Sequence, residues 1–312
     1  MGEAKNGPQL GSRDSGAAAE NQRPVVLLPW KNPKVLSRYR RRRILDRLTA
    51  GLAVTSLLLI LYPLAHILYT FAYRGALAIS IPRLTELSLD GGLANLIVGT
   101  TSLVLIAACF SIPVGVLGGI YLAEFSGSGK YAGVVRFFAD VLAGMPSIIV
   151  GYVGFLILVL YFGWGFSVLA GSVTLGVLML PYIMRTTEIS IRNVPASVRE
   201  AAEALGSTKT QLINKLTFNL ALPGIMTGIL LSVGTAMGET APLLYTASNS
   251  NYYPCGLTNC PVGYLTYIIY TIINVSSTEA QELAYLSSFL LVSFVVSINF
   301  IARIGLKRFS RI

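Results

Sequence analysis

The chain has 312 residues, of which 54% are hydrophobic and only 12% are charged, and its mean hydropathy is +0.65. A soluble domain carries about 25% charged residues, so this composition excludes an ordinary soluble enzyme and indicates a membrane protein. The net charge of +10 does not indicate nucleic-acid binding. The basic residues lie between or outside the apolar stretches, and no nucleic-acid-binding motif accompanies them.

The beginning of the chain is polar and rich in Gly, Ala, Asn and Pro, and residues 1–37 are predicted to be a disordered tail. The first apolar run starts near residue 48 and is too long for the hydrophobic segment of a cleaved signal peptide. We therefore expect the region 38–91 to hold a retained first membrane helix, at 46–72, followed by an outer loop.

Long uncharged stretches predict the membrane helices. A span needs about 20 residues, so the uncharged stretch 141–184 is long enough for two, with a turn at Gly163-Trp164-Gly165. The apolar piece 265–275 is too short to cross and predicts an interfacial or re-entrant helix. The chain is therefore expected to be all-α, a polytopic membrane bundle with six spans. The predicted spans are about 46–72, 94–122, 137–161, 165–185, 219–246 and 281–303.

Three small-residue patterns lie in these spans and predict close helix packing, within the chain or with a partner chain. They are Gly115-x3-Gly119, Gly224-x3-Gly228 and Gly234-x3-Gly238. Pro113, Pro146, Pro181 and Pro242 lie in or at the ends of the spans and are expected to kink them.

The distribution of basic residues predicts the orientation. A cluster of arginines precedes the first span, so the positive-inside rule places the N-terminus in the cytoplasm. Its members are Arg38, Arg40, Arg41, Arg42, Arg43 and Arg47. Six spans then put 123–136, 186–218 and the C-terminus on the same side, which holds all 24 Lys and Arg residues except Arg74 and Arg83. We expect a plasma (inner) membrane protein with both termini cytoplasmic.

The loop at 247–264 faces outward in this topology and carries Cys255 and Cys260. The compartment outside the inner membrane permits a disulfide between them. Two free thiols fit the sequence equally well.

The sequence of the cytoplasmic loop at 189–218 predicts two short helices joined by a turn. Pro195 suits a helix start and Gly206 suits the position just after a helix end. Thr208 and Gln211 have the spacing of a capping box for the second helix. The first helix, between Pro195 and Gly206, is predicted to have one small apolar face. Its residues have helical spacing: Val198, Ala201, Ala202 and Leu205.

Among the charged residues of this first short helix, two are expected to form an ion pair and one is expected to stay unpaired. Arg199 and Glu203 are four residues apart and can pair with each other, which leaves Glu200 free to meet a partner. A solvated hairpin that packs on its own spans explains the same pattern equally well.

Glu200-Ala201-Ala202, followed by three residues and Gly206, resembles the EAA loop of type I, MetI-like permeases of ABC importers. The I-x-L-P segment that many members carry after this loop is absent here. The resemblance implies a MetI-like fold, with a permease domain over 92–306. It also implies that Glu200, Ala201, Ala202 and Gly206 form a coupling element, which docks on a separate ATPase.

Three further segments are similar to the PstA-type permeases of phosphate importers: 142–152, 180–188 and 238–247. This likeness implies an ATP-driven phosphate importer in which the chain forms half of the translocation pathway. The partners that it implies are a second, related permease, a dimer of ATPase subunits and an extracytoplasmic phosphate-binding protein.

Four polar residues are candidates for the translocation pathway: Arg185, Glu188, Glu239 and Thr240. Glu239 follows a long uncharged run, and a carboxylate at membrane depth is expected to face a cavity or a basic partner. The alternatives are a structural ion pair at Glu239 and a simple anchor pair between Arg185 and Glu188. Arg136 and Asp140, four residues apart, suggest another structural pair.

The sequence contains no phosphate-binding loop for ATP, no catalytic constellation and no metal-binding cluster. We therefore expect no enzymatic activity and no bound cofactor, with ATP used by a partner subunit. Two alternatives remain open: a type I permease for another solute, and a secondary transporter driven by an ion gradient.

Overall fold

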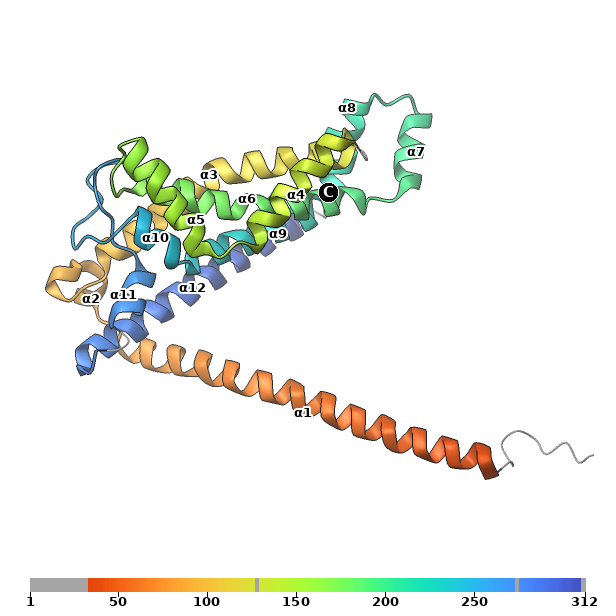
Figure 1. The fold of residues 1–312 in the computed structure, drawn as a ribbon, viewed down its shortest axis with the longest axis horizontal. Coiled ribbons are helices and arrows are strands. Elements are labelled where there is room, and N and C mark those ends of the chain that lie inside the picture. Colours follow the sequence, from red (N-terminus) through yellow and green to blue (C-terminus); the bar gives the residue numbers. More distant parts are fainter. Residues whose placement is uncertain (1–32, 127–128, 273–274, 310–312) are drawn as a thin grey trace, which may run out of the picture. The chain divides into compact units, whose positions relative to one another are not determined.

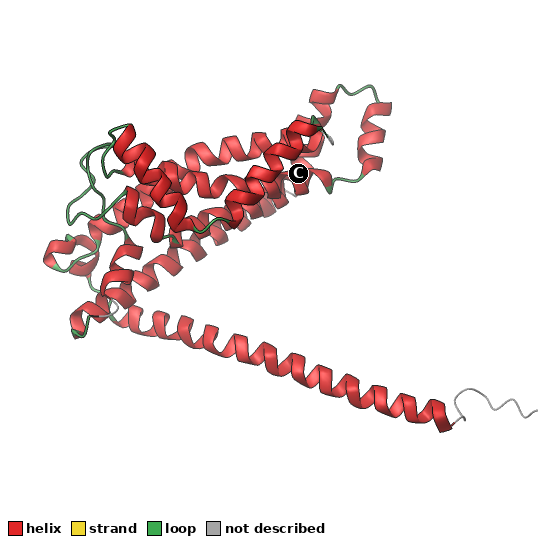
Figure 2. Cartoon of the chain, viewed as in Figure 1, coloured by secondary structure: helices red, strands yellow, loops and turns green. Residues whose placement is uncertain are grey.

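The computed structural model describes residues 33–126, 129–272 and 275–309. These residues are overwhelmingly helical, as Figures 1 and 2 show. The chain divides into two units, Met1–His66 and Ile67–Ile312. The helix α1 (Pro33–Leu77) begins in the first unit and ends in the second. Most of the predicted tail, 1–32, lies outside the described residues, and the helix begins four residues before the tail was expected to end.

Among the described residues, five helices are long and apolar enough to span a membrane. They comprise the segment Leu45–Leu77 of α1, α3 (Ala94–Glu124), α6 (Val168–Arg192), the segment Lys209–Gly238 that ends with α9 (Phe218–Gly238), and α12 (Thr278–Phe309). A bent helix pair brings the number to six if the pair counts as one span. Each of the five overlaps a predicted span, since uncharged length is a local property of the sequence, but the ends differ, most of all in the segment Lys209–Gly238, where the prediction was 219–246.

The third predicted span, 137–161, is not a straight helix. It divides into α4 (Lys130–Gly144), α5 (Ser147–Gly154) and the π-helix η3 (Phe155–Tyr161), with a bend of 104° between α4 and α5. Pro146 stands at the bend and disfavours a helical conformation at Met145, which is extended. The kink expected at this proline is therefore a complete break.

The fifth predicted span, 219–246, also divides. The helix α9 ends at Gly238, Glu239 is extended, and α10 (Ala241–Thr246) follows. Pro242 occupies the first turn of α10, where its missing N–H costs nothing. The prolines Pro113 and Pro181, in contrast, lie inside the continuous helices α3 and α6.

Shorter elements connect the long helices. The apolar piece 265–275 contains α11 (Leu265–Ile272), in agreement with the prediction of a helix too short to cross. Two further short helices, α2 (Ile81–Thr85) and the 3-10 helix η2 (Ser88–Asp90), precede α3.

The helix α6 packs against both α3 and α9, and glycines allow the close approach. Gly115 and Gly119 of α3 lie against α6, and a Cβ atom at Gly119 would lie 2.6 Å from the Met184 carbonyl oxygen. Gly224 and Gly228 of α9 also lie against α6, at Ser190 and Thr186. These two small-residue patterns therefore join the three helices into one tightly packed body.

The third small-residue pattern has a different environment. A Cβ atom at Gly234 would lie 3.4 Å from the nearest atom of Val295, and none of the described atoms lies within 4 Å of such a position at Gly238. This pair is therefore not closely packed within the described chain, and Gly238 stands at the end of α9, where the helix breaks. Packing of this pair against a partner chain stays a prediction.

Candidate functional site: coupling loop, arginine cluster and membrane cavity

The loop between α6 and α9 has the local structure that its sequence predicts. The helix α7 (Ala196–Ala204) starts directly after Pro195, and Gly206 has a φ of +80°, a left-handed conformation that favours glycine. The helix α8 (Lys209–Gln211) begins with the Thr208–Gln211 capping box and continues through the π-helix η4 (Leu212–Thr217) into α9. Figure 1 shows α7 and α8 at one end of the helical bundle.

The surface of α7 is open. None of its residues is buried, Glu200 and Ala201 are exposed, and Leu205 after its end is 87% exposed. Glu200 makes no ion pair within the described residues. Of the predicted apolar face, Ala201 and Leu205 are exposed, whereas Val198 and Ala202 are partly buried, so the described part of the chain covers this face only in part.

The predicted pairing of Arg199 with Glu203 is wrong. Arg199 Nη1 lies 2.5 Å from Oε1 of Glu124, the last residue of α3, and its Nη2 donates to the Ile191 carbonyl at 2.8 Å. The Glu124 side chain is only 6% exposed, whereas Glu203 is exposed to solvent. A buried carboxylate needs a cation far more than a solvated one, and this decides the partner of Arg199.

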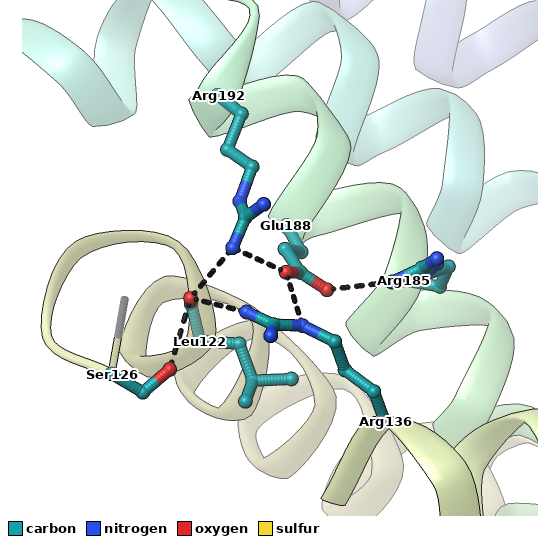
Figure 3. Close-up of polar contacts among 6 residues, drawn as sticks. All are labelled: Leu122, Ser126, Arg136, Arg185, Glu188 and Arg192. Carbon is teal, nitrogen blue, oxygen red and sulfur yellow. Dashed lines mark hydrogen bonds and ion pairs between the residues drawn. The ribbon is translucent and has the colours of Figure 1, made fainter. Parts of the chain in front are cut away.

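A cluster of three arginines surrounds Glu188 near the end of α6 (Figure 3). Its side chain is 2% exposed, and Oε1 lies 2.8 Å from Arg136 Nε and 2.9 Å from Arg192 Nη2. The predicted pair with Arg185 is present, with 3.1 Å between Arg185 Nη1 and Glu188 Oε2. Three guanidinium groups around one carboxylate leave an excess of positive charge.

The same arginines hold the end of α3. The Leu122 carbonyl oxygen accepts hydrogen bonds from Arg136 at 3.1 Å, from Arg192 at 3.3 Å and from the Ser126 hydroxyl at 3.1 Å (Figure 3). The last carbonyl groups of a helix have no partner within the helix, so basic side chains satisfy them well.

Two members of this cluster were missed in the sequence. Arg136 was assigned by spacing to Asp140, but it bonds to Glu188 on another helix. Arg192 follows Glu188 by four residues, and this spacing was a usable signal.

Glu239 lines a cavity of about 200 Å³ at the two helix breaks. Its side chain is partly buried, and it forms no ion pair within the described residues. The backbone carbonyl of Glu239 accepts a hydrogen bond from the Thr266 hydroxyl at 3.0 Å. The other lining residues are Leu142, Ala143, Met145, Ser147, Leu178, Met179, Tyr182, Ser232, Thr235 and Ala236.

One face of α6 connects this cavity with the arginine cluster. Leu178 and Tyr182 line the cavity, and Arg185 follows Tyr182 by three residues, which places it on the same helical face. The Arg185 side chain is 47% exposed. Thr240 lies elsewhere: it lines a separate, largely apolar cavity of about 470 Å³ together with Tyr270 and residues of α12.

A disulfide joins Cys255 and Cys260, whose Cα atoms are 5.9 Å apart. The loop that carries it is bonded to the start of α6 and to the residues just before it. The Asn259 N–H donates to the Trp164 carbonyl at 2.6 Å, and the Leu169 N–H donates to the Leu257 carbonyl at 3.0 Å.

Membrane-length helices, two broken helices around a cavity and an exposed helical hairpin at one end define the class of multi-pass membrane permeases. Residues 111–311 match the family model of the binding-protein-dependent transport system inner membrane component, and the chain belongs to this family. It is therefore a multi-pass inner-membrane permease subunit of an ABC transporter and not its ATPase. The family implies a partner ATPase and a binding protein.

Similar proteins cover nearly the whole chain. The phosphate transport system permease protein PstA 2 of Mycobacterium bovis is 43% identical over 280 residues, which cover 89% of this chain and 93% of the relative. The phosphate transport system permease protein PstA of Yersinia pestis is 35% identical over 294 residues, which cover 90% of this chain and 98% of the relative.

The fold is also similar to a solved structure. A chain of the inward-facing MetNI methionine ABC transporter superposes with a TM-score of 0.57 and 21% sequence identity. The match covers 74% of this chain and 99% of that chain. This confirms the predicted MetI-like, all-helical fold, and the family assignment removes the ion-gradient-driven alternative.

Proposed function

We infer that this chain is the permease component of an ATP-driven phosphate importer and forms half of the translocation pathway with a second, related permease. The observation that carries this inference is the 43% identity to a phosphate permease along 89% of the chain. The helix breaks, the cavity and the exposed loop have the arrangement that such a subunit requires.

The exposed face of α7 is the ATPase-docking surface in this proposal. Glu200 and Ala201 are open to a partner, Ala202 beside them is partly covered, and Gly206 ends the helix. Small side chains let the surface of an ATPase subunit approach the helix closely, and Glu200 offers it an uncompensated charge. Binding of ATP closes the two ATPase subunits, which moves α7 and switches the permease pair between its two open states.

The translocation pathway of this proposal follows the cavity and the adjoining face of α6. Glu239 lines the cavity, and Arg185 follows on the same helical face. A phosphate anion needs positive charge without a tight site, and the three arginines around Glu188 exceed the single carboxylate that they share. Thr240 belongs to the second helix break and to the neighbouring cavity, where it supplies a hydroxyl group.

The orientation in this proposal has both termini in the cytoplasm. The loop at 247–264 then faces outward, where a disulfide between Cys255 and Cys260 is stable. An extracytoplasmic phosphate-binding protein meets the permease pair on this side.

The substrate assignment is tested by uptake of radioactive phosphate into cells that lack this chain and into cells in which it is restored. Uptake is expected to depend on the chain, and excess unlabelled phosphate is expected to abolish the signal. Phosphate uptake that survives deletion of the chain would favour the alternative, a type I permease for another solute.

The docking assignment is tested by the substitution Glu200→Lys. The reversed charge is expected to remove the ATPase subunit from the purified complex, or to leave it bound without transport. Glu279→Lys, at an exposed acid in the first turn of α12, is the matched control and is expected to keep both. Wild-type transport by the Glu200→Lys protein would contradict the assignment.

A further inference from the structure

The C-terminal end of α3 is held by basic side chains from four other elements. Arg136 of α4 and Arg192 of α6 bond to the Leu122 carbonyl. Arg199 of α7 and Lys209 of α8 bond to Glu124. Two of these elements belong to the exposed hairpin that the proposed function assigns to ATPase docking, so the hairpin is tied to one helix of the bundle.

We call Glu124, Arg199 and Lys209 the α3 clasp. Arg199 Nη1 lies 2.5 Å from the Glu124 carboxylate, and Lys209 Nζ donates to the Glu124 carbonyl at 2.9 Å. Lys209 Nζ also lies 4.6 Å from the centre of the Phe125 ring, within the range of a cation–π contact. The Glu124 side chain is 6% exposed, so the ion pair is largely desolvated and is not a loose surface contact.

The clasp contacts the hairpin on both sides of its turn. Arg199 lies before Gly206 in the chain and Lys209 lies after it, and both reach the same residue of α3. Arg199 also donates to the Ile191 carbonyl of α6, so these contacts join α7 to both helices. With them, a swing of α7 relative to α3 requires the buried Glu124 to lose its partner.

The helix α3 extends from the clasp to the second helix break. It is a continuous helix of 31 residues, and close packing at Gly115 and Gly119 joins it to α6. Thr100, Leu103 and Val104 near its other end line a small cavity together with Glu239. At about 1.5 Å per residue, roughly 30 Å of rigid helix separates Val104 from Glu124.

We propose that the α3 clasp makes the docking hairpin and α3 move as one rigid body, so that α3 carries the displacement of α7 to the Glu239 break. Glu124 and Arg199 are positioning residues in this proposal, because they act by joining α7 to α3. The proposal rests on the proposed function, since it needs an ATPase that docks on α7.

The first test opens the clasp by the substitutions Arg199→Ala and Glu124→Ala in the complete importer complex, reconstituted in proteoliposomes. Three quantities are measured: the amount of co-purified ATPase, the ATP hydrolysis stimulated by the loaded binding protein, and phosphate uptake. Each substitution is expected to keep the ATPase bound and to lower both stimulated hydrolysis and uptake by about tenfold. Lys130→Ala, at an exposed basic residue that starts α4 and lies outside the hairpin, is the control and is expected to leave all three quantities unchanged.

The charge-reversed pair Glu124→Arg with Arg199→Glu distinguishes a loss of the mechanical link between α7 and α3 from a general loss of structure. The pair is expected to recover most of the activity that each single reversal loses, because the ion pair is rebuilt with opposite polarity. Wild-type stimulation in Arg199→Ala would overturn the proposal, and so would loss of the ATPase without rescue by the reversed pair. Failure of the wild-type complex to import phosphate would count against the proposed function and not against the clasp.

The second test covers the case in which the single variants fold poorly. Glu124→Cys and Arg199→Cys are introduced together with Cys109→Ser, which removes the exposed free cysteine. A short cross-linker that reacts with thiols then replaces the ion pair by a covalent bridge. Cross-linking is expected to restore uptake, since a clasp that stays closed throughout the cycle tolerates a permanent link. A bridged complex that cannot transport would overturn the proposal.

Discussion

At the residue scale, Glu188 and Glu239 are two acids of the proposed translocation pathway with opposite surroundings. Glu188 is 2% exposed and has three arginines within 3.1 Å. Glu239 faces a cavity and makes no ion pair within the described residues. Glu188 is buried and its charge is balanced by arginines, which indicates a role in stability. The charge of Glu239 is not balanced by an ion pair within the described residues, and such an acid at membrane depth indicates a functional role.

Glu188→Gln is expected to lower the free energy of unfolding by about 2 kcal/mol, because Arg136 would lose its buried partner. The loss stays below that of a fully buried pair, since Arg185 and Arg192 are half exposed and remain solvated. Thermal unfolding of the purified complex checks this. Arg185→Gln serves for comparison and is expected to cost less than about 1 kcal/mol.

Glu239→Gln is expected to leave stability within about 0.5 kcal/mol of the wild type, because no partner in the described chain is lost. Phosphate uptake is expected to fall, since the charge of the cavity changes while its volume does not. Uptake assays at matched protein levels measure this. A variant that transports normally but unfolds at a lower temperature would show that Glu239 has a structural role instead.

At the element scale, close packing of α6 against α3 and α9 depends on glycines that allow backbone contact. Gly119 meets the backbone of α6, whereas Gly234 has room for a side chain. The break after Gly238 and the break at Pro146 give two short helices, α5 and α10, which pack against each other. Breaks of this kind are tolerated at membrane depth where the freed backbone is covered by protein or lines a cavity.

The same substitution is expected to have opposite effects at two glycines. Gly119→Ala is expected to destabilise the protein by about 1–3 kcal/mol, because its Cβ atom would lie 2.6 Å from the Met184 carbonyl oxygen and force α3 away from α6. Gly234→Ala is expected to stabilise it by up to about 1 kcal/mol through the better helix propensity of alanine. Thermal unfolding of both variants in one detergent decides the sign of each effect.

At the scale of the whole molecule, the distribution of charge predicts which end of the bundle faces the partner ATPase. The arginine cluster, the α3 clasp and the docking hairpin all lie around the C-terminal ends of α3 and α6. The disulfide-bonded loop instead contacts the start of α6, at the opposite end of that helix. Basic residues near one end and a disulfide near the other fit a cytoplasmic and an outer side, respectively.

Labelling of single cysteines tests this topology. In a Cys109→Ser background, Tyr252→Cys is expected to react with a membrane-impermeant maleimide in intact cells. Glu200→Cys is expected to react only after the membrane is opened, because the proposed orientation places α7 in the cytoplasm. The reverse labelling pattern would contradict both the orientation and the position of the ATPase.

The sequence by itself determined the membrane class, the positions of the long helices, the local structure of the docking hairpin and the family. Each of these depends on composition, uncharged length or spacing within a few residues, which act locally. It also predicted a kink at Pro146, because proline is costly inside a helix, but it did not predict the break at Glu239, which lies inside the expected span 219–246.

Only the tertiary structure decided the partners of Arg136 and Arg199, both of which spacing along one helix assigned wrongly. It also decided which glycine patterns form helix contacts, and it showed that Glu239 lines a cavity. The physical reason is that a charge selects the least solvated opposite charge within reach. Burial of Glu124 and Glu188 results from the packing of helices that are far apart in the sequence.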